Sequence, residues 1–68
     1  MEYIYLRAWR DELGWTQKQL SDATKIPRST ISETENRNHN PSKDELKKIA
    51  AALGITVEQL YEMPKKKP

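Results

Sequence analysis

The sequence predicts a compact, all-α domain built from five short helices. One local pattern recurs three times, namely an apolar residue or proline, then Ser or Thr, two further residues, Glu or Gln, and Leu. Gly14 and Gly54 each follow a leucine, as left-handed residues after a helix commonly do. No segment shows the alternation of apolar and polar residues that is typical of strands. A chain of 68 residues provides for one domain only.

Apolar residues at helical spacing give two of these helices a face that we expect to be buried. The first helix is predicted from near residue 2 to residue 13, with Leu6, Trp9 and Leu13 on one side. Gly14 ends it. A later helix is predicted from residue 43 to about residue 53. Its inward side is expected to carry Leu46, Ile49, Ala50 and Leu53.

The repeated pattern predicts helix starts at about residues 16, 42 and 56. In each copy the hydroxyl can accept from the amide three residues on, and the Glu or Gln there can reach back to the first amide, which is a capping box. Two copies add a hydrophobic staple, Trp15 with Leu20 and Ile55 with Leu60. We therefore expect one helix over residues 16–24 and a short last one from 57 to about 62, before Pro64.

The remaining helix is predicted over residues 27–36, between a break at Pro27 and a polar loop. Proline suits a first helical turn, because its missing amide hydrogen is not needed there. Ile31 and Thr34 face one side. The other side carries Arg28, Ser29, Ser32, Glu33 and Asn36. The joint to the preceding helix is only about three residues long, which forces the steep crossing of a helix-turn-helix. The polar side alone fits an ordinary solvated surface as well as a surface that reads DNA.

Composition narrows the classes of function. Twelve Lys and Arg against ten Asp and Glu give a net charge of +2, with the positive excess in the middle of the chain and at Lys65–Lys67. The absence of cysteine excludes disulfides and thiolate metal sites. No apolar run reaches the length of a membrane span and no signal peptide opens the chain, so we expect a cytoplasmic protein. His39 is the only histidine, and we expect it to be an ordinary loop residue rather than a metal ligand or a catalytic base. We therefore expect a protein that is not an enzyme and that holds no metal or cofactor.

One stretch and its continuation resemble the Cro/phage-repressor helix-turn-helix family, often called XRE-like. The stretch is Arg10-Asp11-Glu12-Leu13-Gly14-Trp15-Thr16-Gln17-Lys18-Gln19-Leu20-Ser21, and Ile26, Ile31-Ser32 and Glu35-Asn36 continue it. The resemblance covers residues 4–61. It implies a lambda-repressor-like fold with the helix-turn-helix at the second and third helices. It also implies a prokaryotic or phage transcription regulator, more often a repressor, that binds a pseudo-palindromic DNA operator as a homodimer.

The resemblance also implies roles for single residues. Base reading would fall to Arg28, Ser29, Glu33 and Gln17, the last at the edge of the groove where it would meet a phosphate or an adjacent base. Phosphate contacts would come from Thr16, Lys18, Thr30, Ser32, Asn36, Arg37, Asn38, Asn40 and Lys43. Arg10 and Glu35 would form a structural ion pair that orients the third helix.

Three positions depart from the family pattern. Lys25 stands where glycine is common in the turn, so it is expected to adopt a left-handed conformation or to alter the turn. Pro27 replaces a Ser or Thr cap. Arg37 replaces a glycine, which leaves Asn36 or Asn38 to supply the left-handed residue after the third helix.

The predicted domain covers residues 1–63, and residues 64–68 form a flexible basic tail or the start of a linker. The resemblance implies two candidates for the dimer surface, the Val57–Met63 region and the loop between the third and fourth helices. The alternative function keeps the fold and changes the partner. In that case the chain is a protein-binding module, such as an antitoxin or anti-repressor, as its modest charge and the acidic Glu33 would allow.

Overall fold

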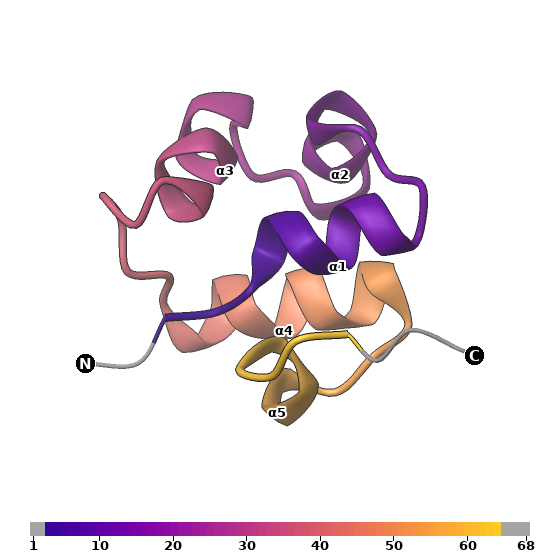
Figure 1. The fold of residues 1–68 in the computed structure, drawn as a ribbon. Helices are drawn as coiled ribbons and strands as arrows, with labels where there is room; N and C mark the ends of the chain where they lie inside the picture. The colour runs from indigo at the N-terminus through magenta and orange to yellow at the C-terminus, as the bar shows by residue number, and fades with distance from the viewer. Residues whose placement is uncertain (1–2, 65–68) are drawn as a thin grey trace.

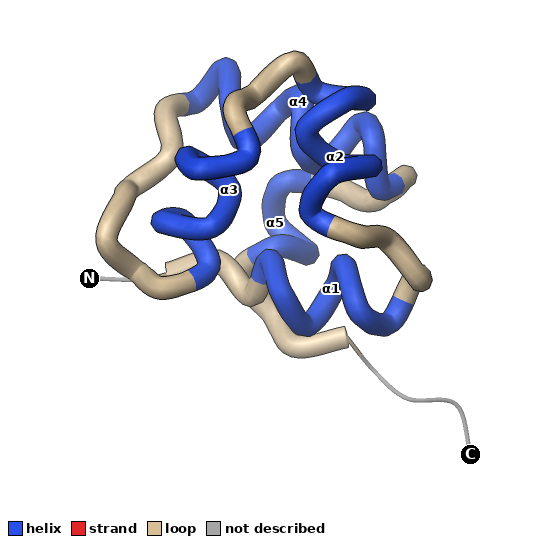
Figure 2. The backbone as a smooth tube through the Cα atoms, turned by 90° about the horizontal axis from the view of Figure 1, so that it is seen from above, coloured by secondary structure: helices blue, strands red, loops and turns tan. Residues whose placement is uncertain are grey.

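The computed structural model describes residues 3–64 and shows an all-α domain with no strand in that range. Its helices are α1 (Leu6–Glu12), α2 (Gln17–Thr24), α3 (Arg28–Glu35), α4 (Lys43–Leu53) and α5 (Val57–Leu60). In Figure 1, α2 and α3 lie at the top, α1 crosses below them, and α4 and α5 form the base. Seen from above, α2 and α3 are nearest the viewer and α5 lies deep between the other helices (Figure 2). The predicted five-helix fold is confirmed.

Capping boxes begin three of the five helices, as the repeated pattern predicts. Thr16 accepts from the Gln19 amide at 3.0 Å, and the Gln19 side chain accepts from the Thr16 amide at 2.9 Å. The same reciprocal bonds form at the starts of α4 and α5, with Ser42 and Thr56 as caps. Each box satisfies two backbone amides that the helix itself leaves unpaired.

The core is formed by aliphatic side chains from every helix. Its most buried members are Leu6, Leu20, Ile31, Ile49 and Leu60. Trp15 and Ile55 are partly buried and pack against this core, which includes Leu20 and Leu60. All four residues predicted to face inward from α4 are buried. Since α2 packs against both α3 and α4, the core fixes the helix-turn-helix on the rest of the domain.

The predicted start of α1 is wrong, and its predicted inward face is wrong in part. The helix begins at Leu6 rather than near residue 2, because the preceding segment pairs with α5 through the Tyr5 amide and the Leu60 carbonyl at 2.7 Å. Ile4, in the same segment, is buried in the core. Leu13 caps α1 and is 43% exposed, because the helix ends at Glu12 and the chain turns away from the core.

Three helix ends also differ from the prediction. Pro27 is not in the first turn of α3 but precedes it as the cap residue, with φ −55° and ψ 141° and no side-chain cap bond. After α3, the left-handed residue is Arg37 itself, with φ 63°, whereas Asn36 has φ −87°. The short α5 ends at Leu60, and Tyr61 and Glu62 continue as turns.

Candidate nucleic-acid interface

The joint between α2 and α3 is held by specific contacts. Lys25 adopts the left-handed conformation with φ 63°, which is one of the two outcomes expected for this position. The Ser21 hydroxyl donates to the Ile26 carbonyl at 2.6 Å, and the Ile26 amide donates to the Thr24 hydroxyl at 3.3 Å. Ile26 itself is buried in the core. These contacts fix the angle at which α3 leaves α2.

The outer face of α3 is exposed and polar. Arg28, Ser29 and Glu33 are exposed, whereas Ile31 and Thr34 point into the core. None of the ion pairs formed among residues 3–64 includes Arg28 or Glu33. A helix whose polar groups have no partner inside the protein can offer them to the edges of DNA bases.

Thr30 and Ser32 lie at the borders of this face and are half-buried. Thr16 and Lys18 are exposed at the start of α2, but the Thr16 hydroxyl is committed to its capping box. Lys18 lies 3.6 Å from Asp22, a solvated pair that costs little to open. Lys18 therefore remains the more available of the two for a phosphate.

Arg10 and Glu35 form a partly buried ion pair between α1 and α3. Arg10 Nε lies 2.8 Å from Glu35 Oε2, and the two side chains are 13% and 5% exposed. Arg10 also donates to the Trp15 carbonyl at 2.8 Å. The hydrogen bond to Glu35 raises the pKa of Arg10 and, with the two carboxylates nearby, outweighs the opposing effect of burial. The pair ties α1 to the end of α3.

Gln17 joins this pair, a contact that could not be predicted from the sequence. Its side-chain Nε2 donates to Glu35 Oε1 at 3.1 Å, and its side chain is half-buried. Gln17 starts α2 and Glu35 ends α3, so only the crossing angle of the two helices brings them together.

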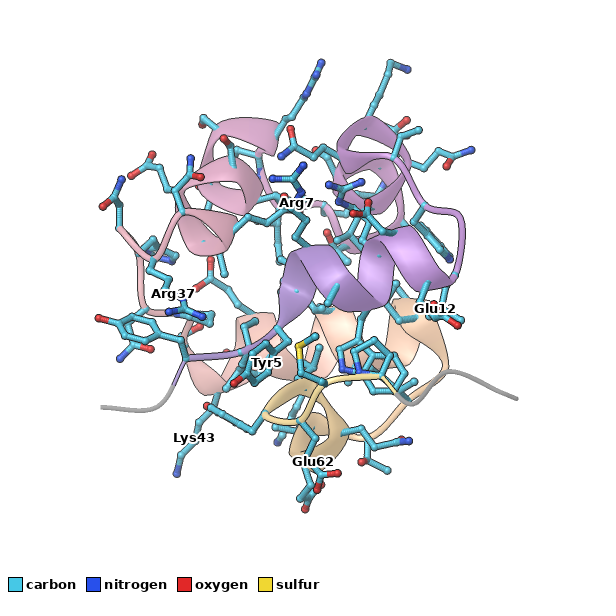
Figure 3. All side chains as sticks on the ribbon, in the orientation of Figure 1. Tyr5, Arg7, Glu12, Arg37, Lys43 and Glu62 are labelled. Carbon is cyan, nitrogen blue, oxygen red and sulfur yellow. The ribbon has the colours of Figure 1, made fainter. Side chains whose placement is uncertain are left out.

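Arg37 and Lys43 lie away from the outer face of α3. The Arg37 guanidinium stacks over the Tyr3 ring at 5.3 Å from its centre, a cation–π contact. In Figure 3 Arg37 lies beside the N-terminal segment, and Lys43 extends from the start of α4 on the side opposite α2 and α3. Asn36, Asn38 and Asn40 are exposed in the loop after α3.

Arg7 is a basic residue that the sequence reasoning missed. It is exposed and lies 3.7 Å from Asp11 on the same helix. Figure 3 shows it between α1 and the pair of helices α2 and α3. Because it directly follows the inward-facing Leu6 on a helix, the sequence indicated only that Arg7 lies on the surface. The tertiary arrangement puts it beside the candidate interface.

His39 contacts the capping box of α4. Its Nε2 lies 3.1 Å from Glu45 Oε1, the oxygen that also accepts from the Ser42 amide at 2.8 Å. The hydrogen bond from the Ser42 amide is the largest cause of the lowered pKa of Glu45. The contact with His39 lowers this pKa further, whereas burial raises it. Within residues 3–64 no cluster of three or more His, Cys, Asp or Glu could hold a metal, and no helix there is long and apolar enough to cross a membrane.

Comparison with known proteins supports the predicted resemblance. The helix-turn-helix family matches residues 6–60. The competence pilus inhibition repressor of Acinetobacter baylyi is 38% identical over 56 residues, which are 82% of this chain and 51% of that protein. A hypothetical transcription factor of Neisseria meningitidis is 31% identical over 62 residues, which are 91% and 58% of the two chains. This chain thus spans little more than half the length of these relatives.

Solved structures give the same result. The crystal structure of the hypothetical transcription factor NHTF from Neisseria superimposes with a TM-score of 0.79 and 32% identity, over 88% of this chain and 69% of that one. The N-terminal DNA-binding domain of SinR from Bacillus subtilis superimposes with a TM-score of 0.77 and 26% identity, over 90% of both chains. The relatives are described as repressors and transcription factors, not as enzymes. On these grounds the chain belongs to the helix-turn-helix family, in its Cro/phage-repressor branch.

Proposed function

We propose that this domain binds double-stranded DNA sequence-specifically and is the DNA-binding part of a transcription regulator, most simply a repressor. The observation that carries the proposal is the outer face of α3, which is polar, unpaired and held at a fixed angle to α2. In this family arrangement the second helix of the pair enters the major groove. The printed descriptions of the relatives and of the SinR domain support the same function.

The base readers in this proposal are the exposed residues of α3. Arg28 stands at the N-terminal end of α3, where it can pair bidentately with guanine, a contact worth about 1–3 kcal/mol of discrimination. Ser29 can donate to or accept from a base, and Glu33 can accept from the amino group of cytosine. A carboxylate on this face also disfavours sites that would bring it against phosphate oxygens.

Phosphate contacts in this proposal surround that face. Lys18, Thr30, Ser32 and the loop asparagines fit it by their positions, and Arg7 joins them because of its place beside α2 and α3. Arg37 and Lys43 fit less well, since one is stacked on Tyr3 and the other extends from the opposite side of the domain. Contacts of this kind position a protein on DNA without reading its sequence.

We further propose that two copies act together on a pseudo-palindromic operator in the bacterial or phage-infected cytoplasm. A single small domain offers few base contacts, so useful affinity requires a second half-site about one helical turn away. The segment Val57–Met63 offers a surface for this pairing, because Met63 is exposed and Val57 is half-buried.

The test is selection of binding sites from a random duplex library by the wild-type protein, Arg28→Ala and Lys47→Ala. Lys47 is a matched control, because it is an exposed cation on α4. We expect a two-fold symmetric motif that Arg28→Ala relaxes at one base pair in each half-site and that Lys47→Ala leaves intact. Failure to enrich any motif at low salt would contradict the proposal.

A protein partner is the second candidate, and one observation favours it. A structural neighbour with a TM-score of 0.77 and 28% identity is solved as the complex of SinR protein with SinI protein. Salt distinguishes the two candidates. Binding to several phosphates weakens steeply as salt rises, whereas a protein interface of mixed polarity changes much less.

A further inference from the structure

Glu35 makes more contacts than an ion pair requires. Its Oε2 accepts from Arg10 Nε at 2.8 Å. Its Oε1 accepts from Arg10 Nη2 at 3.2 Å and from Gln17 Nε2 at 3.1 Å. Glu35 is on α3 and its partners are on α1 and α2, so one carboxylate that is 5% exposed joins three helices.

This contact fixes the orientation of the Gln17 amide. A carboxylate only accepts hydrogen bonds, so the amide must turn an N–H toward it, and the reverse orientation would bring two oxygens together. Gln17 has two N–H donors and one carbonyl oxygen. With one N–H held by Glu35, the second remains available at the N-terminus of α2. A side chain already held in this way loses less entropy when it binds a ligand.

Arg10 makes the arrangement compatible with a polyanion. A lone carboxylate beside Gln17 would repel an approaching phosphate. Arg10 balances that charge through two hydrogen bonds of its own. Glu35 can therefore hold Gln17 close to DNA without presenting a net negative charge there.

We propose that Glu35 is a positioning residue for DNA binding, which holds one N–H of Gln17 so that the other meets a phosphate oxygen of the DNA backbone. This inference rests on the DNA binding proposed above. It makes Gln17 a backbone contact rather than a base reader. It also gives the Arg10–Glu35 pair a part in binding beyond its part in folding.

A double-mutant cycle tests the proposal. Binding to the duplex recovered by selection is measured by fluorescence anisotropy for the wild type, Gln17→Ala, Glu35→Gln and the double variant. The temperature is one at which circular dichroism shows every variant folded. A glutamine at position 35 is neutral and has one acceptor oxygen instead of two, so the charge-assisted bond to the Gln17 amide is lost. If Glu35→Gln does not fold, Glu35→Asp takes its place, because the shorter carboxylate keeps the charge but cannot span both partners.

We expect Gln17→Ala to weaken binding about tenfold, the size of one lost hydrogen bond to a charged group. Glu35→Gln should weaken binding about fivefold in the wild-type background and less than about twofold beside Gln17→Ala, since two groups that act as one do not add. Glu12→Gln is the control, because it removes an exposed carboxylate from the end of a different helix, α1. Loss of negative charge alone should tighten DNA binding slightly, so the two Glu→Gln variants should differ in sign.

The outcomes separate the two levels of the argument. An equal loss from Glu35→Gln in both backgrounds would mean that Glu35 acts through the fold alone and would overturn the inference. A changed base preference in Gln17→Ala would make Gln17 a base reader and overturn it as well. If the wild-type protein enriches no duplex, the proposed DNA binding fails first and this inference fails with it.

Discussion

Replacing Glu35 by alanine tests the contribution of the Arg10–Glu35 pair to folding. Breaking one side of a buried ion pair typically costs about 3–5 kcal/mol, because the remaining charge stays without its partner. Arg10 keeps its bond to the Trp15 carbonyl and lies 3.3 Å from the exposed Asp11, so we expect the lower end, about 3 kcal/mol. For a domain of this size that corresponds to a fall in melting temperature of roughly 12–24 °C.

The assay is thermal and urea unfolding followed by circular dichroism, with Glu12→Ala as the control for loss of a carboxylate on the surface. The double variant Arg10→Met/Glu35→Leu should recover most of the lost stability, because apolar residues of similar size can replace a buried pair at little cost. A Glu35→Ala protein that melts within about 4 °C of the wild type would behave like a surface variant. That result would refute the idea that this pair secures α3.

Three further predictions concern the turn between α2 and α3, the core and the capping box of α4. Lys25→Gly should raise the free energy of unfolding by about 0.5–1 kcal/mol in a urea titration, because glycine adopts φ 63° without strain; a loss of stability would contradict this. Thr34→Val should be neutral or stabilising by up to about 1 kcal/mol in thermal melts, since the buried hydroxyl only donates to the Thr30 carbonyl four residues earlier, and a clear loss would show that this bond matters. The pKa of Glu45 is lower in the folded protein than its ordinary value of 4.5, so ionised Glu45 stabilises the fold at pH values above 4.5. This stabilisation is lost as the pH falls through the lower, folded-state pKa. In unfolding measured against pH, Glu45→Gln should lack this part of the loss of stability in acid, and an unchanged acid profile would contradict the prediction.

Most of the fold could be predicted because local chemistry decides it. A hydroxyl and a glutamine or glutamate three residues apart satisfy the same amides in any context, so the starts of α2, α4 and α5 follow from the letters alone. The glycines after α1 and α4 act in the same local way, with φ 76° and 74°. The beginning of α1 was beyond such reasoning, because the segment before it is held by the Leu60 carbonyl, more than fifty residues away.

The same distinction explains the candidate site. Which residues face outward on α3 follows from helical period and is visible in the sequence. Which long side chains meet depends on the angle between helices and on rotamers that the sequence does not specify. Arg37 illustrates this, since its left-handed backbone and the nearby Tyr3 ring turn a residue expected to meet a phosphate toward the protein itself.

The charge distribution of the domain favours selective rather than tight binding by one copy. A net charge of +2 supplies little general attraction to DNA, and Glu33 on the outer face of α3 reduces it further. Non-specific affinity depends mainly on the number of phosphates neutralised, so a domain whose cations are nearly balanced by carboxylates should dissociate readily from random sequence. In the proposed complex, its preference for an operator would then come from the few directional contacts of Arg28, Ser29 and Glu33. A pre-oriented Gln17 is consistent with binding that relies on few charges, because a neutral amide fixed in place adds affinity without adding charge.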